Sequence, residues 1–138
     1  MIKWCDYLWS ISQGPVIRNP RYPTLSEGIK KRGFTFGDWV PPIGDDRTPN
    51  PHIGDDCYST IYHFISTSLV AKISSILEDE KNVQFYQQRS EEIKKAFVKE
   101  FITSSGRMAY NDQTSYSMAF ANDLIPDDYK EKTKQYFS

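Results

Sequence analysis

The chain has 138 residues, a length that suits one domain with a core of its own. Its 17 lysines and arginines nearly balance 18 aspartates and glutamates, and this net charge of −1 gives no reason to expect nucleic acid or an anionic membrane as a partner. No apolar run approaches the roughly 20 residues of a membrane span, no signal peptide precedes the first helix, and the compartment (cytoplasm, periplasm or exterior) stays open.

A short helix is expected at residues 2–11, because Trp4, Cys5, Leu8 and Ile11 then share one face. Gln13-Gly14-Pro15 ends it, since proline cannot continue a helix. From Gly14 to about Asp55 no helical period is sustained, and every proline except Pro126 lies in that stretch. An irregular segment of this length in a compact domain usually serves a function or is disordered.

Two long amphipathic helices follow. The first runs from Asp55 or Asp56, either of which could cap it, to about Glu78. Apolar residues recur along it at three- and four-residue steps, which is typical of an amphipathic helix: Tyr58, Ile61, Tyr62, Ile65, Leu69, Ile73, Ile76 and Leu77. The second, after a turn at residues 79–82, turns Tyr86, Ile93, Phe97 and Phe101 inward. So short a turn makes the pair an antiparallel helical hairpin.

A third helix is expected at residues 114–122, and a fourth restarts at Pro126-Asp127-Asp128, where proline and acids suit a first turn. Helical patterns run uncapped off both ends, which favours a piece of a larger helical array. The expected fold class is all-α. A barrel of helical hairpins, with a long irregular loop between the first and second helices, fits this pattern better than a solenoid with short loops.

The best binding candidate is Asp38 with Trp39, within Gly33-Phe34-Thr35-Phe36-Gly37-Asp38-Trp39-Val40. An indole can stack on the C–H face of a pyranose, and a neighbouring carboxylate can accept hydrogen bonds from its hydroxyls. The alternative is that Trp39 anchors its own loop to the core while Asp38 caps the turn.

Other polar residues point to no second site. A metal ion is one interpretation of the acidic cluster that consists of Asp45, Asp46, Asp55, Asp56 and His52. The spacing of these residues matches no calcium loop. Solvated loop acids or helix caps explain them better. We therefore predict no metal and no cofactor. His63 is expected to be a core or interface histidine, and Cys5 and Cys57 to be free, buried thiols.

Several of these motifs together resemble the bacterial alpha-L-rhamnosidases, a family of inverting glycoside hydrolases. Met1-Ile2-Lys3-Trp4-Cys5-Asp6-Tyr7-Leu8 and the Gly37-Asp38-Trp39 box are similar to family motifs. Further matches follow in the family's order along nearly the whole chain: Leu69-Val70-Ala71-Lys72-Ile73, Tyr86, Ile93, Ala96-Phe97, Phe101, Gly106, Asp112-Gln113-Thr114 and Leu124-Ile125-Pro126. Only the Gly-Asp-Trp box is distinctive.

The resemblance implies that residues 1–138 are an internal fragment of one (α/α) six-hairpin barrel domain that hydrolyses terminal alpha-L-rhamnosyl bonds. It places Trp39 and Asp38 in the sugar pocket, with a rhamnose-containing carbohydrate as the partner. The family's general acid lies in an upstream Asp-Glu-Arg-x-Gly-Trp box and its base downstream. Neither occurs here, so no catalytic residue is predicted and the chain alone should be inactive. A longer segment from Pro41 to Asp55 departs from the family pattern and leaves the shape of the rim open.

Two other interpretations stay open. One is another glycosidase with the same barrel, such as a trehalase-like or fucosidase-like enzyme. The other is a complete helical scaffold or carbohydrate-binding module. For a barrel fragment we also expect self-association through exposed helix faces.

Overall fold

The computed structural model describes residues 1–12, 14–17 and 55–137. Five helices make up this part of the chain: α1 (Ile2–Ile11), α3 (Asp55–Ile76), α4 (Glu80–Phe101), α5 (Gln113–Ala121) and α6 (Asp127–Lys134). Ile102 and Met108 form an isolated antiparallel β bridge, and none of the described residues belongs to a strand. The all-α prediction is confirmed for these residues. None of their helices is long and apolar enough to cross a membrane.

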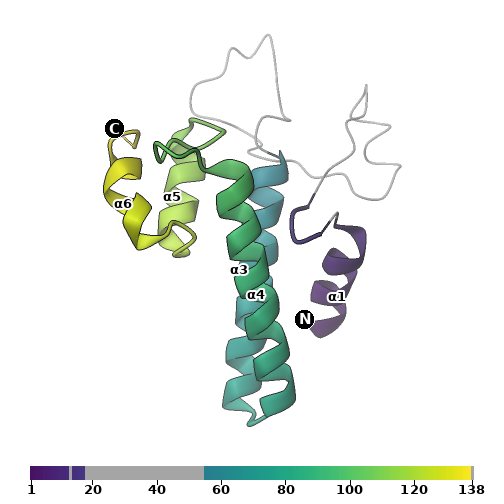
Figure 1. The fold of residues 1–138 in the computed structure, drawn as a ribbon. Helices are drawn as coiled ribbons and strands as arrows, with labels where there is room; N and C mark the ends of the chain where they lie inside the picture. Colours follow the sequence, from purple (N-terminus) through teal and green to yellow (C-terminus); the bar gives the residue numbers. More distant parts are fainter. Residues whose placement is uncertain (13, 18–54, 138) are drawn as a thin grey trace, which may run out of the picture.

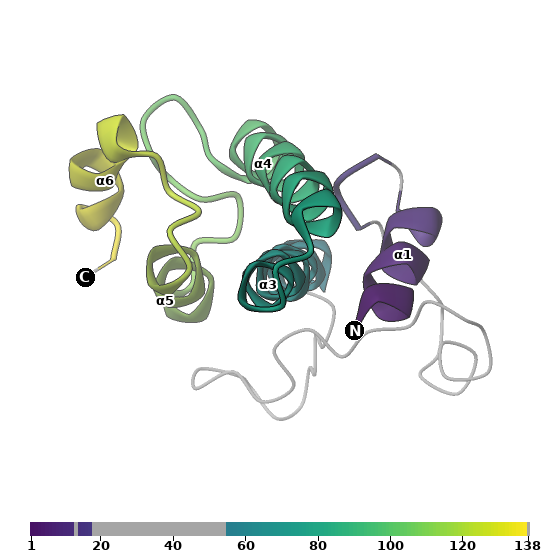
Figure 2. The same ribbon diagram turned by 90° about the horizontal axis from the view of Figure 1, so that it is seen from below.

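The antiparallel hairpin of α3 and α4 is the centre of the arrangement (Figure 1). Helices α5 and α6 lie on one side of it and α1 on the other, as the view from below also shows (Figure 2). The start of α3, the end of α4 and the start of α5 lie at the same end of the hairpin (Figure 1). The closed barrel needs more hairpins than this segment holds and stays a prediction.

A tight turn closes the hairpin. Helix α3 ends at Ile76, Glu78 adopts a φ of 56°, and Asp79 caps α4 by accepting a hydrogen bond from the Asn82 backbone N–H at 3.2 Å. A side-chain cap of this kind satisfies a backbone donor that the first helical turn leaves unpaired. The turn is therefore shorter than the expected residues 79–82, because Glu80 to Asn82 already belong to α4.

The buried face of α4 is the one that its sequence predicts. Tyr86, Ile93, Phe97 and Phe101 are all nearly inaccessible to solvent. They are joined along the helix by Val83 and Ser90. The main core cluster lies where α3, α4 and α5 meet: Val16, Cys57, Ile61, Phe97, Phe101, Met108, Tyr116, Ala119, Leu124 and Ile125.

The apolar residues that recur along α3 are buried only near its start. Tyr58 and Ile61 are buried, but five large apolar side chains are exposed by 42–80%: Tyr62, Leu69, Ile73, Ile76 and Leu77. The opposite side is buried instead, with Thr60, His63, Thr67, Val70, Ala71 and Ser74. Small side chains at a helix contact let the two helix axes approach closely. The small residues on this side therefore allow α3 to pack closely against neighbouring helices. We call the five exposed residues the α3 stripe.

Helix α1 is attached by a few strong contacts. Cys5 is buried as predicted and Leu8 is buried with it, whereas Trp4 and Ile11 are exposed by 54% and 40%. Asp6 is paired with Arg89 of α4 at 2.7 Å and accepts a hydrogen bond from the Tyr86 hydroxyl at 3.0 Å. This carboxylate fixes the position of α1 against α4.

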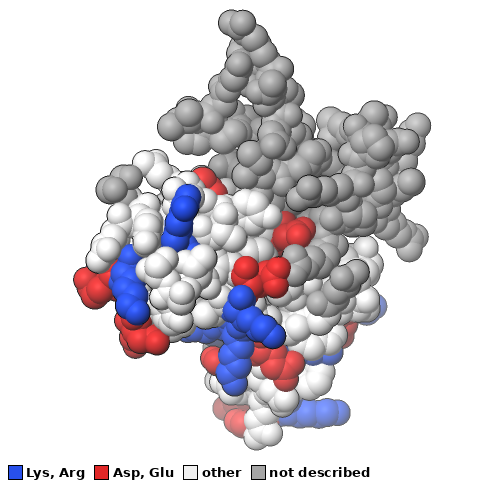
Figure 3. All heavy atoms as spheres, turned by 45° about the horizontal axis from the view of Figure 1, so that its top comes forward, with Lys and Arg blue, Asp and Glu red and all other residues white. Residues whose placement is uncertain are grey.

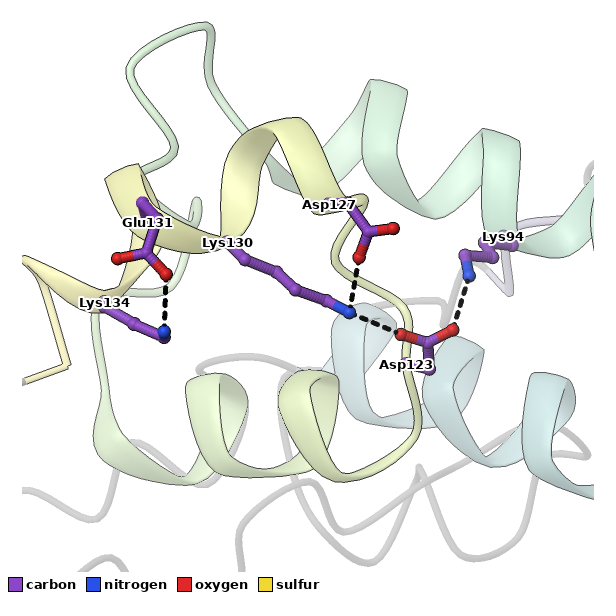
Figure 4. A network of polar contacts seen from close by, with 6 residues as sticks. All are labelled: Lys94, Asp123, Asp127, Lys130, Glu131 and Lys134. Atoms are coloured by element: carbon purple, nitrogen blue, oxygen red, sulfur yellow. Dashed lines mark hydrogen bonds and ion pairs between the residues drawn. The ribbon is translucent and has the colours of Figure 1, made fainter.

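Helix α6 is tied to the hairpin through Asp123, which adopts a φ of 53° in the turn before it. Its carboxylate pairs with Lys94 of α4 at 3.2 Å and Lys130 of α6 at 3.0 Å (Figure 4). The hydrogen bonds from Lys130 and Lys94 hold the pKa of Asp123 below its usual value. These pairs are exposed to solvent, so each contributes little to stability, and together they set the place of α6.

Gly106 brings the α4–α5 connection against α6. It has a φ of 88°, and a Cβ at this position would lie 2.8 Å from the Lys132 Cβ and 3.0 Å from the Thr133 backbone nitrogen. Only glycine meets both the conformation and the close approach.

On the described surface, basic and acidic side chains are interspersed on the face that Figure 3 shows.

Candidate functional site

The predicted binding residues Asp38 and Trp39 lie outside the described residues, as do Asp45, Asp46 and His52. Asp55 and Asp56 lie within the first turn of α3 rather than at its cap, which corrects that expectation. The described residues hold no group of three or more His, Cys, Asp or Glu side chains that could bind a metal ion. The structure does place the residues on either side of 18–54, at Ile17 and at the start of α3.

The described residues on either side of 18–54 meet at the first two turns of α3. The segment begins after Ile17, whose backbone N–H donates a hydrogen bond to Thr60 Oγ1 at 3.1 Å. The Thr60 hydroxyl in turn donates to the Asp56 carbonyl oxygen at 2.7 Å. The segment ends at Asp55, the first residue of α3. Thr60 and Ile17 are both buried, so water competes little for this hydrogen bond.

A second contact joins the start of α3 to the start of α5. Asp112 caps α5: its Oδ1 accepts from the Ser115 backbone N–H at 2.8 Å, and its Oδ2 accepts from the Ser115 hydroxyl at 2.7 Å. The Tyr58 hydroxyl also donates to Asp112 Oδ1, at 2.8 Å. Three donors on two helices thus converge on one carboxylate, and hydrogen bonds to a charged acceptor are the stronger kind.

The connection before α5 is ordered by Tyr116. Its buried hydroxyl donates to Asn111 Oδ1 at 2.8 Å and accepts from the Met108 backbone N–H at 3.1 Å. Sequence reasoning quoted Asp112 only as part of a family motif and missed this framework. A capping aspartate three residues ahead of Ser115 is a signal that could have indicated the start of α5, but nothing in the sequence pairs Asp112 with Tyr58.

The two cysteines are free and buried, as predicted. Burial raises the pKa of the Cys57 thiol to about 12, although a hydrogen bond with Ser115 opposes the shift, and burial also raises the pKa of Cys5. Thiols held protonated in this way are poor nucleophiles. The described structure therefore gives neither of them a chemical role.

His63 is a buried interface histidine, also as predicted. It is inaccessible to solvent, and its ring meets the Trp9 ring edge-on with centres 5.9 Å apart. Neither ring nitrogen has a hydrogen-bond partner of good geometry among the described residues. Burial lowers its pKa to about 4, only partly opposed by the Pro15 carbonyl and reinforced by the positive charge of Arg89.

An open groove of about 620 Å³ lies between α1 and the first half of α4. Ile2, Asp6, Phe85, Tyr86 and Arg89 are among the residues that line it. The Arg89 guanidinium lies over the rings of Trp9 and Phe85, 4.8 and 4.2 Å from their centres. With its charge also paired to Asp6, Arg89 fastens α1 to the hairpin here.

The model of the bacterial alpha-L-rhamnosidase six-hairpin glycosidase domain matches residues 1–137. The chain belongs to this family.

Known alpha-L-rhamnosidases support the assignment over most of the chain. The curated enzyme of Formosa agariphila is 27% identical over 103 residues, which cover 73% of this chain and 11% of that protein. The curated enzyme of Streptomyces avermitilis is 28% identical over 102 residues, which cover 74% of this chain and 9% of that protein. The chain thus spans about a tenth of the length of the curated alpha-L-rhamnosidases it matches.

Solved alpha-L-rhamnosidase structures share the helical arrangement. The Streptomyces avermitilis enzyme, crystallised with L-rhamnose, superposes with a TM-score of 0.72 at 23% identity, over 97% of this chain and 11% of that one. The Dictyoglumus thermophilum enzyme gives a TM-score of 0.75 at 18% identity, and the match covers 99% of this chain and 14% of that one. At these identities the likeness establishes the fold.

Proposed function

We propose that the longer protein to which this chain corresponds is a glycoside hydrolase that cleaves terminal alpha-L-rhamnosyl bonds in glycans or glycosides. The observation that carries the proposal is the match of residues 1–137 to the six-hairpin glycosidase domain of the bacterial alpha-L-rhamnosidases. The rhamnose complex of the Streptomyces avermitilis structure supports a rhamnose-containing carbohydrate as the ligand.

Within that enzyme this chain supplies part of the wall of the sugar pocket. Trp39 stacks its indole on the apolar face of the ring, and Asp38 accepts hydrogen bonds from the sugar hydroxyls. Hydrolysis with inversion needs two carboxyl groups, one that protonates the leaving group and one that activates water. Both lie outside this chain, whose own residues bind and orient the sugar.

Replacing Trp39 with alanine in the longer protein is expected to raise the KM for an aryl alpha-L-rhamnoside by roughly tenfold, because stacking of about 1 kcal/mol or somewhat more is lost. Steady-state kinetics measure the change. Trp4→Ala, on the exposed side of α1, is the matched control and should leave the KM unchanged. The chain alone should show no turnover.

An unchanged KM in the Trp39→Ala protein would mean that this tryptophan anchors its own segment instead. Turnover of the rhamnoside by the chain alone would contradict the placement of the two catalytic carboxyl groups outside it. A longer protein that cleaves trehalose or a fucoside, but no rhamnoside, would favour the other glycosidases of this barrel type.

We also propose that the isolated chain self-associates through the α3 stripe, whose Ile76 and Leu77 are exposed by 80% and 71%. Large exposed apolar side chains gathered on one element tend to be covered in solution. Light scattering should give a mass above 16.0 kDa that falls toward the monomer in an Ile76→Glu, Leu77→Glu variant. Gln84→Glu, at an exposed site on α4, is the control. A strictly monomeric unmodified chain would overturn the proposal.

A further inference from the structure

Helix α1 packs on the hairpin apart from the main core. The main core cluster, where α3, α4 and α5 meet, includes Val16 but no residue of α1. The buried Cys5 of α1 belongs instead to a smaller cluster with Val70, Ala71 and Tyr86. The two clusters share no residue, so α1 can leave the hairpin without opening the main core. A unit attached in this way opens at a lower free-energy cost than the whole domain.

The chain that follows α1 has a point about which the helix can turn. Gly14 adopts a φ of 72°, and nothing packs within 4 Å of the position that a Cβ would take there. Beyond it, Val16 and Ile17 are buried, and the Ile17 backbone N–H is hydrogen-bonded to Thr60 of α3. The residues after Gly14 are therefore fixed to the hairpin, and a movement of α1 can end at this glycine.

His63 lies in the contact that such a movement would open. It belongs to α3, has no solvent exposure, and meets the Trp9 ring of α1 edge-on. Neither of its ring nitrogens has a hydrogen-bond partner of good geometry among the described residues. A buried imidazole in this situation is held in its neutral form, because a proton would create a cation out of reach of water. Detachment of α1 removes the Trp9 ring and gives water access to the imidazole.

The described groups around His63 oppose a proton with one exception. The Arg89 guanidinium of α4 is positive, and Asp6 of α1 is paired with Arg89 rather than with the histidine. Trp9 of α1 is neutral. The Pro15 carbonyl, which precedes α3 in the chain, favours the proton and offsets the cost of burial only in part. Burial, reinforced by Arg89, therefore lowers the pKa of His63 from 6.5 to about 4.

We infer that a proton on His63 releases α1 from the hairpin while the main core stays folded, so that α1 is an acid-sensitive element of this domain. The detached state binds the proton and the attached state resists it, so the attachment is complete above about pH 6.5 and weakens as the pH falls toward 4. The ratio of detached to attached α1 should be roughly twentyfold larger at about pH 5 than at about pH 7. This release needs no substrate and is separate from the proposed sugar chemistry.

Amide hydrogen exchange in the protein expressed from its full reading frame measures this release. Exchange rates at about pH 7 and about pH 5 are each divided by the intrinsic rate at that pH, which leaves the opening equilibrium. The amides of residues 5–11 in α1 should lose roughly twentyfold in protection at the lower pH. The amides of residues 93–101 in α4 are the internal control and should be more strongly protected than those of α1 at both pH values.

Two variants remove the titrating group. His63→Gln and His63→Phe cannot take up the proton, so the protection of α1 should agree at the two pH values within about twofold. His52→Gln, which removes the other histidine of this chain, should keep the full change. Equal protection of residues 5–11 and 93–101 would mean that α1 opens only together with the core, and overturns the inference. So does a change that persists in the His63 variants, or an unmodified protein in which the protection of α1 is the same at both pH values.

Discussion

Replacing Phe97 with alanine is expected to lower the free energy of unfolding by about 3–5 kcal/mol, the cost of deleting a fully buried aromatic ring. Phe97 has no solvent exposure and lies in the main core cluster, with its ring centre 5.2 Å from that of Phe101. Domains have roughly 5–15 kcal/mol of stability in total, so this variant should be close to unfolding. Urea denaturation followed by circular dichroism measures the loss.

Phe85→Ala is the matched control, since it removes the same atoms from the same helix at a position that is 47% exposed. It should cost no more than about 1 kcal/mol, mostly through the lost contact with Arg89. Equal losses in the two variants would contradict the assignment of the core to this face of α4.

Acidification is expected to destabilise the protein through His63. Its pKa is 6.5 in the unfolded chain and about 4 in the folded one, so below pH 6.5 the unfolded state binds the proton and the folded state resists it. The stabilisation is complete above about pH 6.5 and is lost as the pH falls toward 4, by up to about 3 kcal/mol. Among the described groups that face His63, only the Pro15 carbonyl favours the cation, and it offsets the cost of burial in part; Trp9 of α1 is neutral and Arg89 of α4 is itself positive.

Unfolding free energies measured by urea titration at several pH values between 7 and 4 (~0.5-unit steps) test this expectation. His63→Gln should remove most of the slope between pH 6.5 and 4. His52→Gln separates the contribution of the second histidine. A slope that survives in His63→Gln would contradict the role of His63.

The helices were predictable because their signals are local. Residues 2–11 form the expected helix, and the predicted hairpin is found with its ends within a few residues of those expected. The restart at Pro126-Asp127-Asp128 is also confirmed, with Pro126 at the cap and both acids in the first turn. In each case the deciding feature, a periodic face or a terminal proline, belongs to neighbouring residues and needs no knowledge of the tertiary structure.

The orientation of α3 was not predictable in the same way. Its large apolar residues and its small residues lie on opposite sides, and periodicity favours the larger ones as the interior. The structure buries the side with Thr60, Thr67 and Ala71 because the contact with neighbouring helices rewards close approach. Which side of α3 is buried depends on the surfaces of the helices packed against it. The periodicity of one helix carries no information about those surfaces.

The candidate site also has one part that the sequence indicated and one part that it did not. Asp38 and Trp39 were chosen for the chemistry of their side chains, and they stay a proposal. The hydrogen bonds of Tyr58 to Asp112 and of Ile17 to Thr60 were missed because they join residues 54 and 43 positions apart in the sequence. Such pairings arise only once the helices have been packed together.

The two buried thiols have a practical consequence. Cys5 lies in the contact of α1 with the hairpin, and Cys57 lies at the start of α3, beside Ser115. A thiol reagent can reach each cysteine only when its surroundings open. The labelling rate at Cys5 therefore reports detachment of α1 from the hairpin. The labelling rate at Cys57 reports opening of the start of α3. The unmodified chain thus contains a reporter for each of two separate opening motions, distinguishable by which cysteine carries the label.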